Sequence, residues 1–221
     1  EDGIRDRSPS RGLGDVYKRQ HSDFEIVPIN NIQKVVARRL TEAKQEVPHF
    51  YLTVDCEIDN LLGVREDLNS RAKNNEFKIS INDMIIKACA VALMQVPAAN
   101  ASWSDEGIKI YKNANISVAV AINDGLITPI LNNANRKGLL TISSEMNELV
   151  SQAHAGTLTP DQYQGGTFSI SNLGMYGVKS FQAIINPPQG CIMAIGKVEK
   201  KPIVKNLSLI HISEPTRRTP I

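Results

Sequence analysis

The sequence predicts an α/β fold, a two-layer sandwich in which helices cover one side of a mixed β-sheet. Helical and strand-like patterns mix along the chain without the regular alternation of a doubly wound parallel sheet. The composition, 42% hydrophobic and 22% charged over 221 residues, is ordinary for a globular protein with one sizeable domain. The run at 116–122, which is apolar apart from one serine, is typical of a central strand that is covered on both faces.

The first two predicted helices lie on either side of a strand-like segment. Apolar residues repeat at helical spacing across 31–46, and Pro48 closes that segment. A second helix is expected over about 59–72, with Asp59 as its N-cap. Between them, apolar and polar residues alternate strictly over 50–59, which predicts a half-buried strand.

Two further helices are expected in the middle of the chain. Residues 80–97 are apolar nearly all round, begin with the capping-box pair Ser80 and Asp83, and stop at Pro97, which predicts a buried helix. Another helix is predicted over about 142–155. Strands complete the pattern: one near 108–111, the run at 116–122, a further one after a turn at 123–125, a hydroxyl-rich strand at 167–171, and two more before residue 207.

Charge and cysteine content exclude several classes of function. The net charge is +2, and the termini, 1–23 and 208–221, leave only +1 for 24–207, which disfavours nucleic acid or an anionic membrane as the main partner. No apolar run reaches the 18 or so residues of a membrane span. Cys56, Cys89 and Cys191 lack the spacing of a zinc site or a redox dithiol, so we expect buried thiols and no metal.

The two ends of the chain differ from the rest. Residues 1–20 have mixed charges and no apolar period, and we expect a non-native or disordered flank, followed by a linker over 21–30. After Asn206 the strand-like pattern gives way abruptly to a tail of other composition, so 208–221 is interpreted as non-native. Both ends resemble translated adapter sequence.

The hydroxyl-rich strand is the first candidate for a functional site. Thr167, Ser169 and Ser171 share one face because side chains alternate along a strand. Such a row is either a solvated strand face or the source of a hydrogen-bond donor at a point where negative charge develops in a reaction. The spacing alone does not choose among the three residues.

Three stretches carry a resemblance to a known family. They are VARRLTEAKQEVPHFYLTVDCEID, NDGLITPIL and LTPDQYQGGTFSISNLGMYGVKSFQAIINPPQGCIMAIG. Together they resemble the catalytic domain of the dihydrolipoamide acyltransferases, the core components of 2-oxo acid dehydrogenase complexes, with the pyruvate type most similar. The resemblance covers about 24–207 and implies a chloramphenicol acetyltransferase-like fold, truncated at its C-terminal end. The implied reaction is acetyl transfer between dihydrolipoamide and coenzyme A.

The resemblance also implies roles for individual residues. It assigns the oxyanion-stabilising serine to Ser171, with Asn172 in support. The general base of the family is the histidine of a His-x-x-x-Asp-Gly motif, which is absent from this chain, and His211 lies in a segment that lacks the aspartate and the glycine. Arg39 is expected to pair with the aspartate of that motif, or otherwise to lie on a solvated helix face.

Three more residues are candidates for the substrate channel: His49, Asp124 and Gly125. The alternatives are a structural role for His49 at a corner between helix and strand, and simple turn geometry for Asp124 and Gly125.

The resemblance finally implies cofactors and partners. The lipoyl group would be carried by a separate domain that this chain lacks, and coenzyme A would be a substrate. The intact parent would form a homotrimer and a larger core, and would meet the decarboxylase and dihydrolipoamide dehydrogenase components through absent domains. Bacterial cytoplasm is favoured over the mitochondrial matrix. We expect the fragment itself to be inactive, and the alternative function is a non-catalytic structural core or binding component. Acyl specificity stays open.

Overall fold

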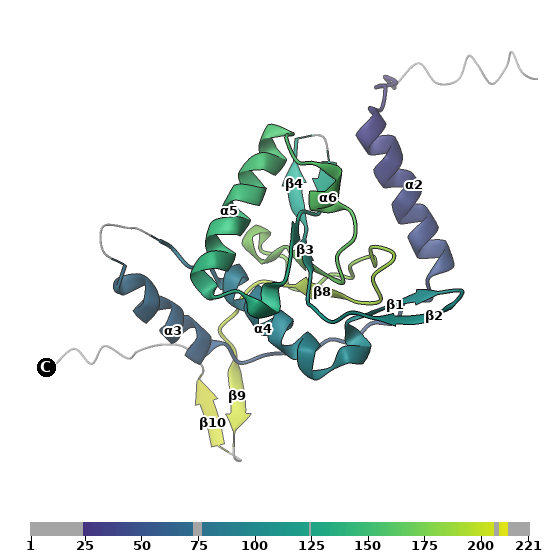
Figure 1. Ribbon diagram of the computed structural model, residues 1–221. Coiled ribbons are helices and arrows are strands. Elements are labelled where there is room, and N and C mark those ends of the chain that lie inside the picture. Colours follow the sequence, from purple (N-terminus) through teal and green to yellow (C-terminus); the bar gives the residue numbers. More distant parts are fainter. Residues whose placement is uncertain (1–23, 73–76, 124, 206–207, 212–221) are drawn as a thin grey trace, which may run out of the picture.

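A mixed four-stranded sheet forms the centre of the protein (Figure 1). The computed structural model describes residues 24–72, 77–123, 125–205 and 208–211. The strand order is β6 (Ile130–Leu131), β3 (Ile116–Val118), β7 (Phe168–Asn172) and β8 (Ile192–Ile195). β3 pairs antiparallel with β6 and parallel with β7, and β7 pairs parallel with β8. The mixed sheet predicted from the sequence is therefore confirmed.

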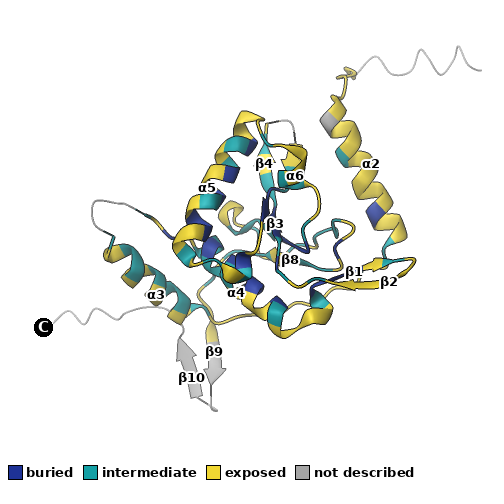
Figure 2. Ribbon diagram, in the orientation of Figure 1, coloured by how far each residue is buried: buried dark blue, intermediate teal, exposed yellow. Residues whose placement is uncertain are grey.

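Two helices cover one face of this sheet and bury the core against it (Figure 2). They are α4 (Ile81–Gln95) and α5 (Leu139–Ala155). Ile116 and Ile170 of the sheet are fully buried and belong to the same apolar cluster as residues of both helices. Removal of so much aliphatic surface from water is the main force that joins the layers.

The ends of the buried helix α4 lie where the sequence predicted them. Ser80 Oγ accepts a hydrogen bond from Asp83 N, and an Asp83 carboxylate oxygen accepts one from Ser80 N, which completes a capping box. Pro97 opens a short 3₁₀ turn, η2 (Pro97–Ala99), directly after the helix. None of the helices in the described part of the chain is both long and apolar enough to cross a bilayer.

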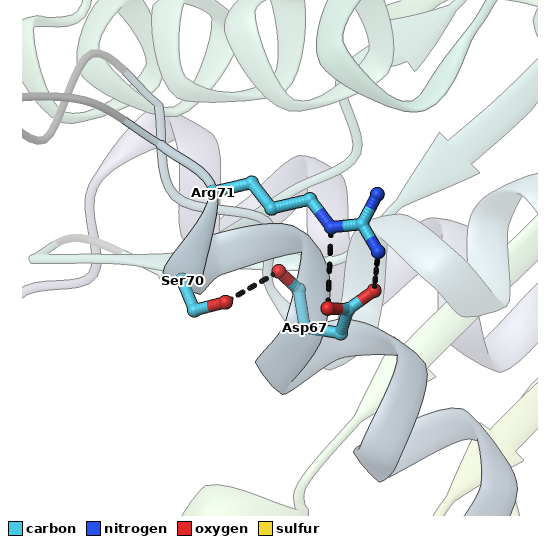
Figure 3. Close-up of polar contacts among 3 residues, drawn as sticks. All are labelled: Asp67, Ser70 and Arg71. Carbon is cyan, nitrogen blue, oxygen red and sulfur yellow. Dashed lines mark hydrogen bonds and ion pairs between the residues drawn. The ribbon is translucent and has the colours of Figure 1, made fainter.

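The first helices, α2 (Asn31–Glu46) and α3 (Asp59–Ser70), also follow the predicted pattern, with one correction. Asp59 was expected to cap α3, but Ile58 occupies the N-cap position without a side-chain hydrogen bond, and Asp59 lies in the first turn. A carboxylate there still interacts favourably with the helix dipole. The last turn is closed by polar contacts (Figure 3): an Arg71–Asp67 ion pair at 2.6 Å and a hydrogen bond from Ser70 Oγ to the Asp67 carbonyl.

The apolar run at 116–122 divides into two strands rather than forming one. β3 stays in the central sheet, whereas β4 (Val120–Ile122) pairs antiparallel with β5 (Gly125–Ile127). Pro129 lies between β5 and β6 and has no N–H, so it contributes only its carbonyl, which accepts a hydrogen bond from Val118 N. The β3–β6 ladder therefore ends at Pro129, and the run at 116–122 divides at the residue opposite the proline, Val118.

Two more hairpins and a short helix complete the fold. β1 (Ala101–Ser104) pairs with β2 (Gly107–Ile110), and α6 (Pro160–Tyr163) precedes β7. β9 (Pro202–Lys205) pairs with β10 (Ser208–His211), so a backbone ladder extends into the tail that the sequence analysis set aside.

The predicted half-buried strand at 50–59 is wrong. In the described structure, residues 50–56 join no sheet, and Phe50, Leu52 and Val54 are 78 to 83% exposed. Cys56, expected to be buried, is exposed as well. Alternation shows which side chains share a face, but burial requires a neighbouring strand or layer, and none lies beside this segment in the described part of the chain.

Candidate active site

The three hydroxyl side chains at the start of β7 and within it differ in their hydrogen bonds. Thr167 Oγ1 accepts a hydrogen bond from Asn115 N at 3.1 Å and lies 3.3 Å from Asn115 O. Ser169 Oγ donates to the side-chain carbonyl of Gln189. Both residues are at least 97% buried. Ser171 is half-buried, and its hydroxyl forms no hydrogen bond with any residue that the structure describes. Of the three candidates, Ser171 alone keeps a donor available for another molecule.

Ser171 lies near the carboxyl end of β7, beside the edge strand β8. It is directly opposite Ala194, which is exposed and carries a small side chain, so this face of the sheet is open next to the hydroxyl. The chain turns sharply after β7 through η4 (Gly174–Tyr176). A Cβ at Gly174 would lie 2.8 Å from the carbonyl oxygen of Gly196, so glycine permits this close approach.

Asn172, the expected supporting residue, points to the opposite face, where α4 packs. Its Nδ2 donates to Asn82 Oδ1 at 3.4 Å, and its Oδ1 accepts from Gly174 N at 2.9 Å. Its contacts shape the turn after β7 and join that turn to the start of α4. The structure does not bring the Asn172 side chain together with the Ser171 hydroxyl.

His49 uses both of its ring nitrogens in hydrogen bonds to the backbone. Nε2 accepts from Ile185 N at 3.0 Å, and Nδ1 lies 2.7 Å from Val47 O. Since an amide can only donate and a carbonyl can only accept, Nε2 is the unprotonated nitrogen and Nδ1 carries the proton. The ring thus fastens the corner after α2 to the segment before β8. These contacts favour the structural alternative over a channel role.

Arg39 and Gly125 form no hydrogen bond or ion pair with Ser171 in the described structure. Arg39 is exposed on α2 and forms no ion pair within the described residues, whereas its neighbour Arg38 lies 3.8 Å from Glu42. Gly125 opens β5 with a φ of 148°, a conformation that favours glycine. Asp124 lies outside the described residues.

The described residues offer no metal site and no activated thiol. No group of three or more His, Cys, Asp or Glu side chains gathers there at ligating geometry. Burial raises the pKa of the Cys89 thiol to about 11, and its Sγ lies 3.7 Å from Met193 Sδ. Because the thiolate is the reactive form, Cys89 is an inert core residue.

Gln189 is the residue that the sequence analysis missed. Its side chain is 97% buried and joins three parts of the chain around β7, through Ser169 on β7, Ser117 on β3 and the carbonyl of Gly165. The available signal was a lone polar residue between a Pro-Pro corner and an apolar strand. A buried amide at such a position indicates a hydrogen-bonding role.

A separate apolar groove of about 590 Å³ lies between α3 and α4. Leu61 and Val64 of α3 and Met84 and Val91 of α4 are among its lining residues. Ser171 does not line it, so this groove is not the site described above.

Comparisons with known proteins show the family to which the sequence is similar. The family model of the 2-oxoacid dehydrogenases acyltransferase (catalytic domain) matches residues 21–214. The dihydrolipoyllysine-residue acetyltransferase component of the pyruvate dehydrogenase complex from Rickettsia bellii is 51% identical over 220 residues, which cover 98% of this chain and 53% of that protein. The component of the same name from Rickettsia conorii is 52% identical over 200 residues, covering 90% of this chain and 48% of that protein. The chain therefore spans about half the length of these curated relatives.

Solved structures share the fold. A probable dihydrolipoamide acetyltransferase from Listeria monocytogenes superimposes with a TM-score of 0.82 at 30% identity, over 86% of this chain and 82% of that one. The dihydrolipoamide acetyltransferase of Azotobacter vinelandii superimposes with a TM-score of 0.83 at 27% identity, over 94% of this chain and 84% of that one. In that enzyme a serine, a histidine and an asparagine have been investigated for their role in the catalytic mechanism. The chloramphenicol acetyltransferase-like class expected from the sequence is confirmed.

Proposed function

The chain belongs to the 2-oxoacid dehydrogenase acyltransferase family as a catalytic domain, and from this premise we propose that it serves acetyl transfer between dihydrolipoamide and coenzyme A. The relatives from both Rickettsia species are acetyltransferase components of the pyruvate dehydrogenase complex. The observation that carries the proposal is the open hydroxyl of Ser171, next to two hydroxyls that are already bonded.

The proposed chemistry needs a base and an oxyanion donor. A base takes the proton of the coenzyme A thiol, the thiolate attacks the carbonyl carbon of the acetyl thioester, and negative charge develops on the carbonyl oxygen. Ser171 Oγ would donate to that oxygen. Collapse of the tetrahedral species breaks the bond to the lipoyl sulfur, which takes up a proton. One such donor is worth about 10² to 10³ in kcat when it is pre-positioned in a site that excludes water.

The base would be supplied by the His-x-x-x-Asp-Gly motif of the family, which this sequence does not contain. His49 is a poor substitute because both of its nitrogens are already bonded to the backbone. We therefore expect this chain alone to transfer no acetyl group. A second candidate function is a non-catalytic structural core or binding component of the complex, which would need neither the base nor the Ser171 hydroxyl.

The proposed assembly is a homotrimer within a larger core. Support comes from exposed apolar side chains on the 50–56 segment and from Trp103 and Ile108 on the β1–β2 hairpin, surfaces that a second copy could cover. A solved structure of the cubic core of the pyruvate dehydrogenase multienzyme complex, whose chain is 28% identical with a TM-score of 0.83, supports this proposal. The lipoyl group would arrive on a separate domain, and further domains would contact the decarboxylase and dihydrolipoamide dehydrogenase. Bacterial relatives support a bacterial cytoplasm, although one relative is mitochondrial.

The test measures acetyl transfer from acetyl coenzyme A to free dihydrolipoamide. This chain is compared with an extended chain in which the residues after Asn206 are replaced by the His-x-x-x-Asp-Gly ending of a related domain. We expect activity only in the extended chain, and a loss of about 10²-fold or more in kcat on Ser171→Ala.

A matched control is Ser143→Ala, which removes a buried hydroxyl on α5 that donates to the Lys78 carbonyl. It should leave kcat nearly unchanged. If the extended chain folds and transfers nothing, the catalytic role fails and the structural role replaces it.

A further inference from the structure

We infer that Gln189 is the positioning residue that fixes the register of β7 and thereby directs Ser171 to the open face of the sheet. This inference deepens the proposed function, since the positioning matters for catalysis only if Ser171 is the oxyanion donor.

The carbonyl oxygen and the NH₂ group of the Gln189 amide both form hydrogen bonds. Its Oε1 accepts from Ser169 Oγ, while its Nε2 donates to Ser117 Oγ at 2.9 Å and to the Gly165 carbonyl at 3.0 Å. The two serines face each other across neighbouring strands, because Ser117 of β3 is in register with Ser169 of β7. One buried side chain thus connects β3, β7 and the segment that enters β7.

The surroundings of this amide leave little freedom. Gly166 has a φ of 77°, and a Cβ there would lie 2.3 Å from Ser117 Oγ and 2.8 Å from Gln189 Nε2. Both contacts are far below van der Waals separation, so the glycine lets the backbone close over the network. Buried polar groups in a tight network stabilise one arrangement, because any other arrangement leaves a donor or acceptor unpaired.

The parallel pair of β7 and β8 needs such a constraint. The segment between them, 173–191, contains only the short turn η4 among its described elements, so no tight hairpin sets the register. At the start of the pair, the bond from Ser169 N to the Cys191 carbonyl is 3.4 Å long, at the limit of a hydrogen bond. Gln189 lies two residues before Cys191 and binds the same Ser169 through its side chain. It therefore supports the ladder at a point where the backbone hydrogen bond is long.

Register determines which group faces the substrate. A slip of one residue moves every side chain of a strand to the other face. Ser171 would turn toward α4, and Ile170 or Asn172 would take its place. Ser169 and Ser171 are two residues apart on one face, roughly 6.6 Å along a strand, so a constraint on Ser169 acts almost directly on Ser171.

The experiment compares Gln189→Met with Asn69→Leu. Asn69 is the matched control because its half-buried amide also makes two hydrogen bonds, to the N–H and carbonyl of Ile79, at the end of α3. Amide hydrogen exchange of peptides covering 167–172 is measured by mass spectrometry on the full chain. Comparison is made at temperatures where the two variants have equal global stability.

We expect Gln189→Met to speed exchange in 167–172 at least tenfold, while Asn69→Leu leaves it unchanged. In the extended chain, Gln189→Met should lower kcat at least tenfold with KM within about twofold, because Ser171 acts on the transition state. Equal exchange in both variants, or an unchanged kcat, would overturn the inference. Should Gln189→Met not fold, Ser169→Ala serves instead, because it removes only the hydrogen bond between Gln189 and β7. It must also speed exchange in 167–172 and lower kcat, by smaller factors.

The outcomes separate the two proposals. If the unsubstituted extended chain is inactive, the proposed function fails, while the exchange measurement still decides whether Gln189 holds the register. If that chain is active and Gln189→Met keeps its kcat, the positioning role fails and the proposed function stands.

Discussion

Gly166→Ala should be one of the most destabilising single substitutions in this domain. The residue has a φ of 77°, where an L-residue loses about 1–2 kcal/mol relative to glycine. Its new Cβ would also lie 2.3 Å from Ser117 Oγ. Relief of that overlap requires movement in a packed interior, which costs about 1–3 kcal/mol. It also disturbs the hydrogen bond between Ser117 and Gln189, worth about 1 kcal/mol. We expect a total loss of about 3–6 kcal/mol from these effects.

The assay is urea unfolding followed by circular dichroism, with Gly156→Ala as the control. Gly156 ends α5 with a φ of 69°, nearly the same backbone conformation, but a Cβ there would meet nothing within 4 Å. The control therefore reports the backbone contribution alone, about 1–2 kcal/mol. Combination of Gly166→Ala with Ser117→Ala should recover part of the loss, because the nearest obstructing atom is gone. Equal losses for Gly166→Ala and Gly156→Ala would refute the packing argument.

Two further predictions concern ionisation. Iodoacetamide at pH 8.5 should modify Cys56 first, Cys191 more slowly and Cys89 last, as measured by peptide mass spectrometry. The reason is that Cys56 is exposed, whereas burial raises the pKa of the other two thiols. Early modification of Cys89 would contradict the burial argument. The pKa of Glu199 is lowered, chiefly by a hydrogen bond from Lys197, so the interaction stabilises the fold above the ordinary glutamate pKa of 4.5 and is lost as pH falls through the folded value. Glu199→Gln should therefore reduce the acid dependence of stability below about pH 4.5 in pH-dependent urea unfolding, and an unchanged dependence would show that the pairing has no effect.

Local signals in the sequence predicted the helices well. The Ser80–Asp83 capping box and Pro97 fix the ends of α4 through contacts only a few residues apart, so no knowledge of the rest of the fold was needed. The strand at 50–59 failed for the opposite reason. The alternation is present in the sequence, but a strand becomes half-buried only when another strand or layer packs against it. Whether such a neighbour exists depends on contacts far along the chain or with another molecule.

The candidate site was likewise predicted only where the signal is local in the sequence. Spacing placed Thr167, Ser169 and Ser171 on one face, and only the family resemblance selected Ser171. The structure adds a physical reason, because the partners of the other two hydroxyls, Asn115 and Gln189, come from 52 and 20 residues away in the sequence. Such pairings leave no periodic signal, and this explains why the role of Gln189 was missed.

The exposed segment 50–56 has a consequence for the integrity of the chain. Proteases cleave exposed chain that can enter their active site as a strand, and this stretch is exposed and belongs to no ladder in the described structure. Limited digestion should therefore cut here before it reaches the sheet. The cut would separate α2 and His49 from the rest of the domain, and the hydrogen bond from Ile185 to His49 would become a contact between two fragments. A molecule that covers segment 50–56 would protect its peptide bonds from cleavage and keep α2 attached. The rate of cleavage between α2 and α3 would therefore report whether this segment is covered by another molecule.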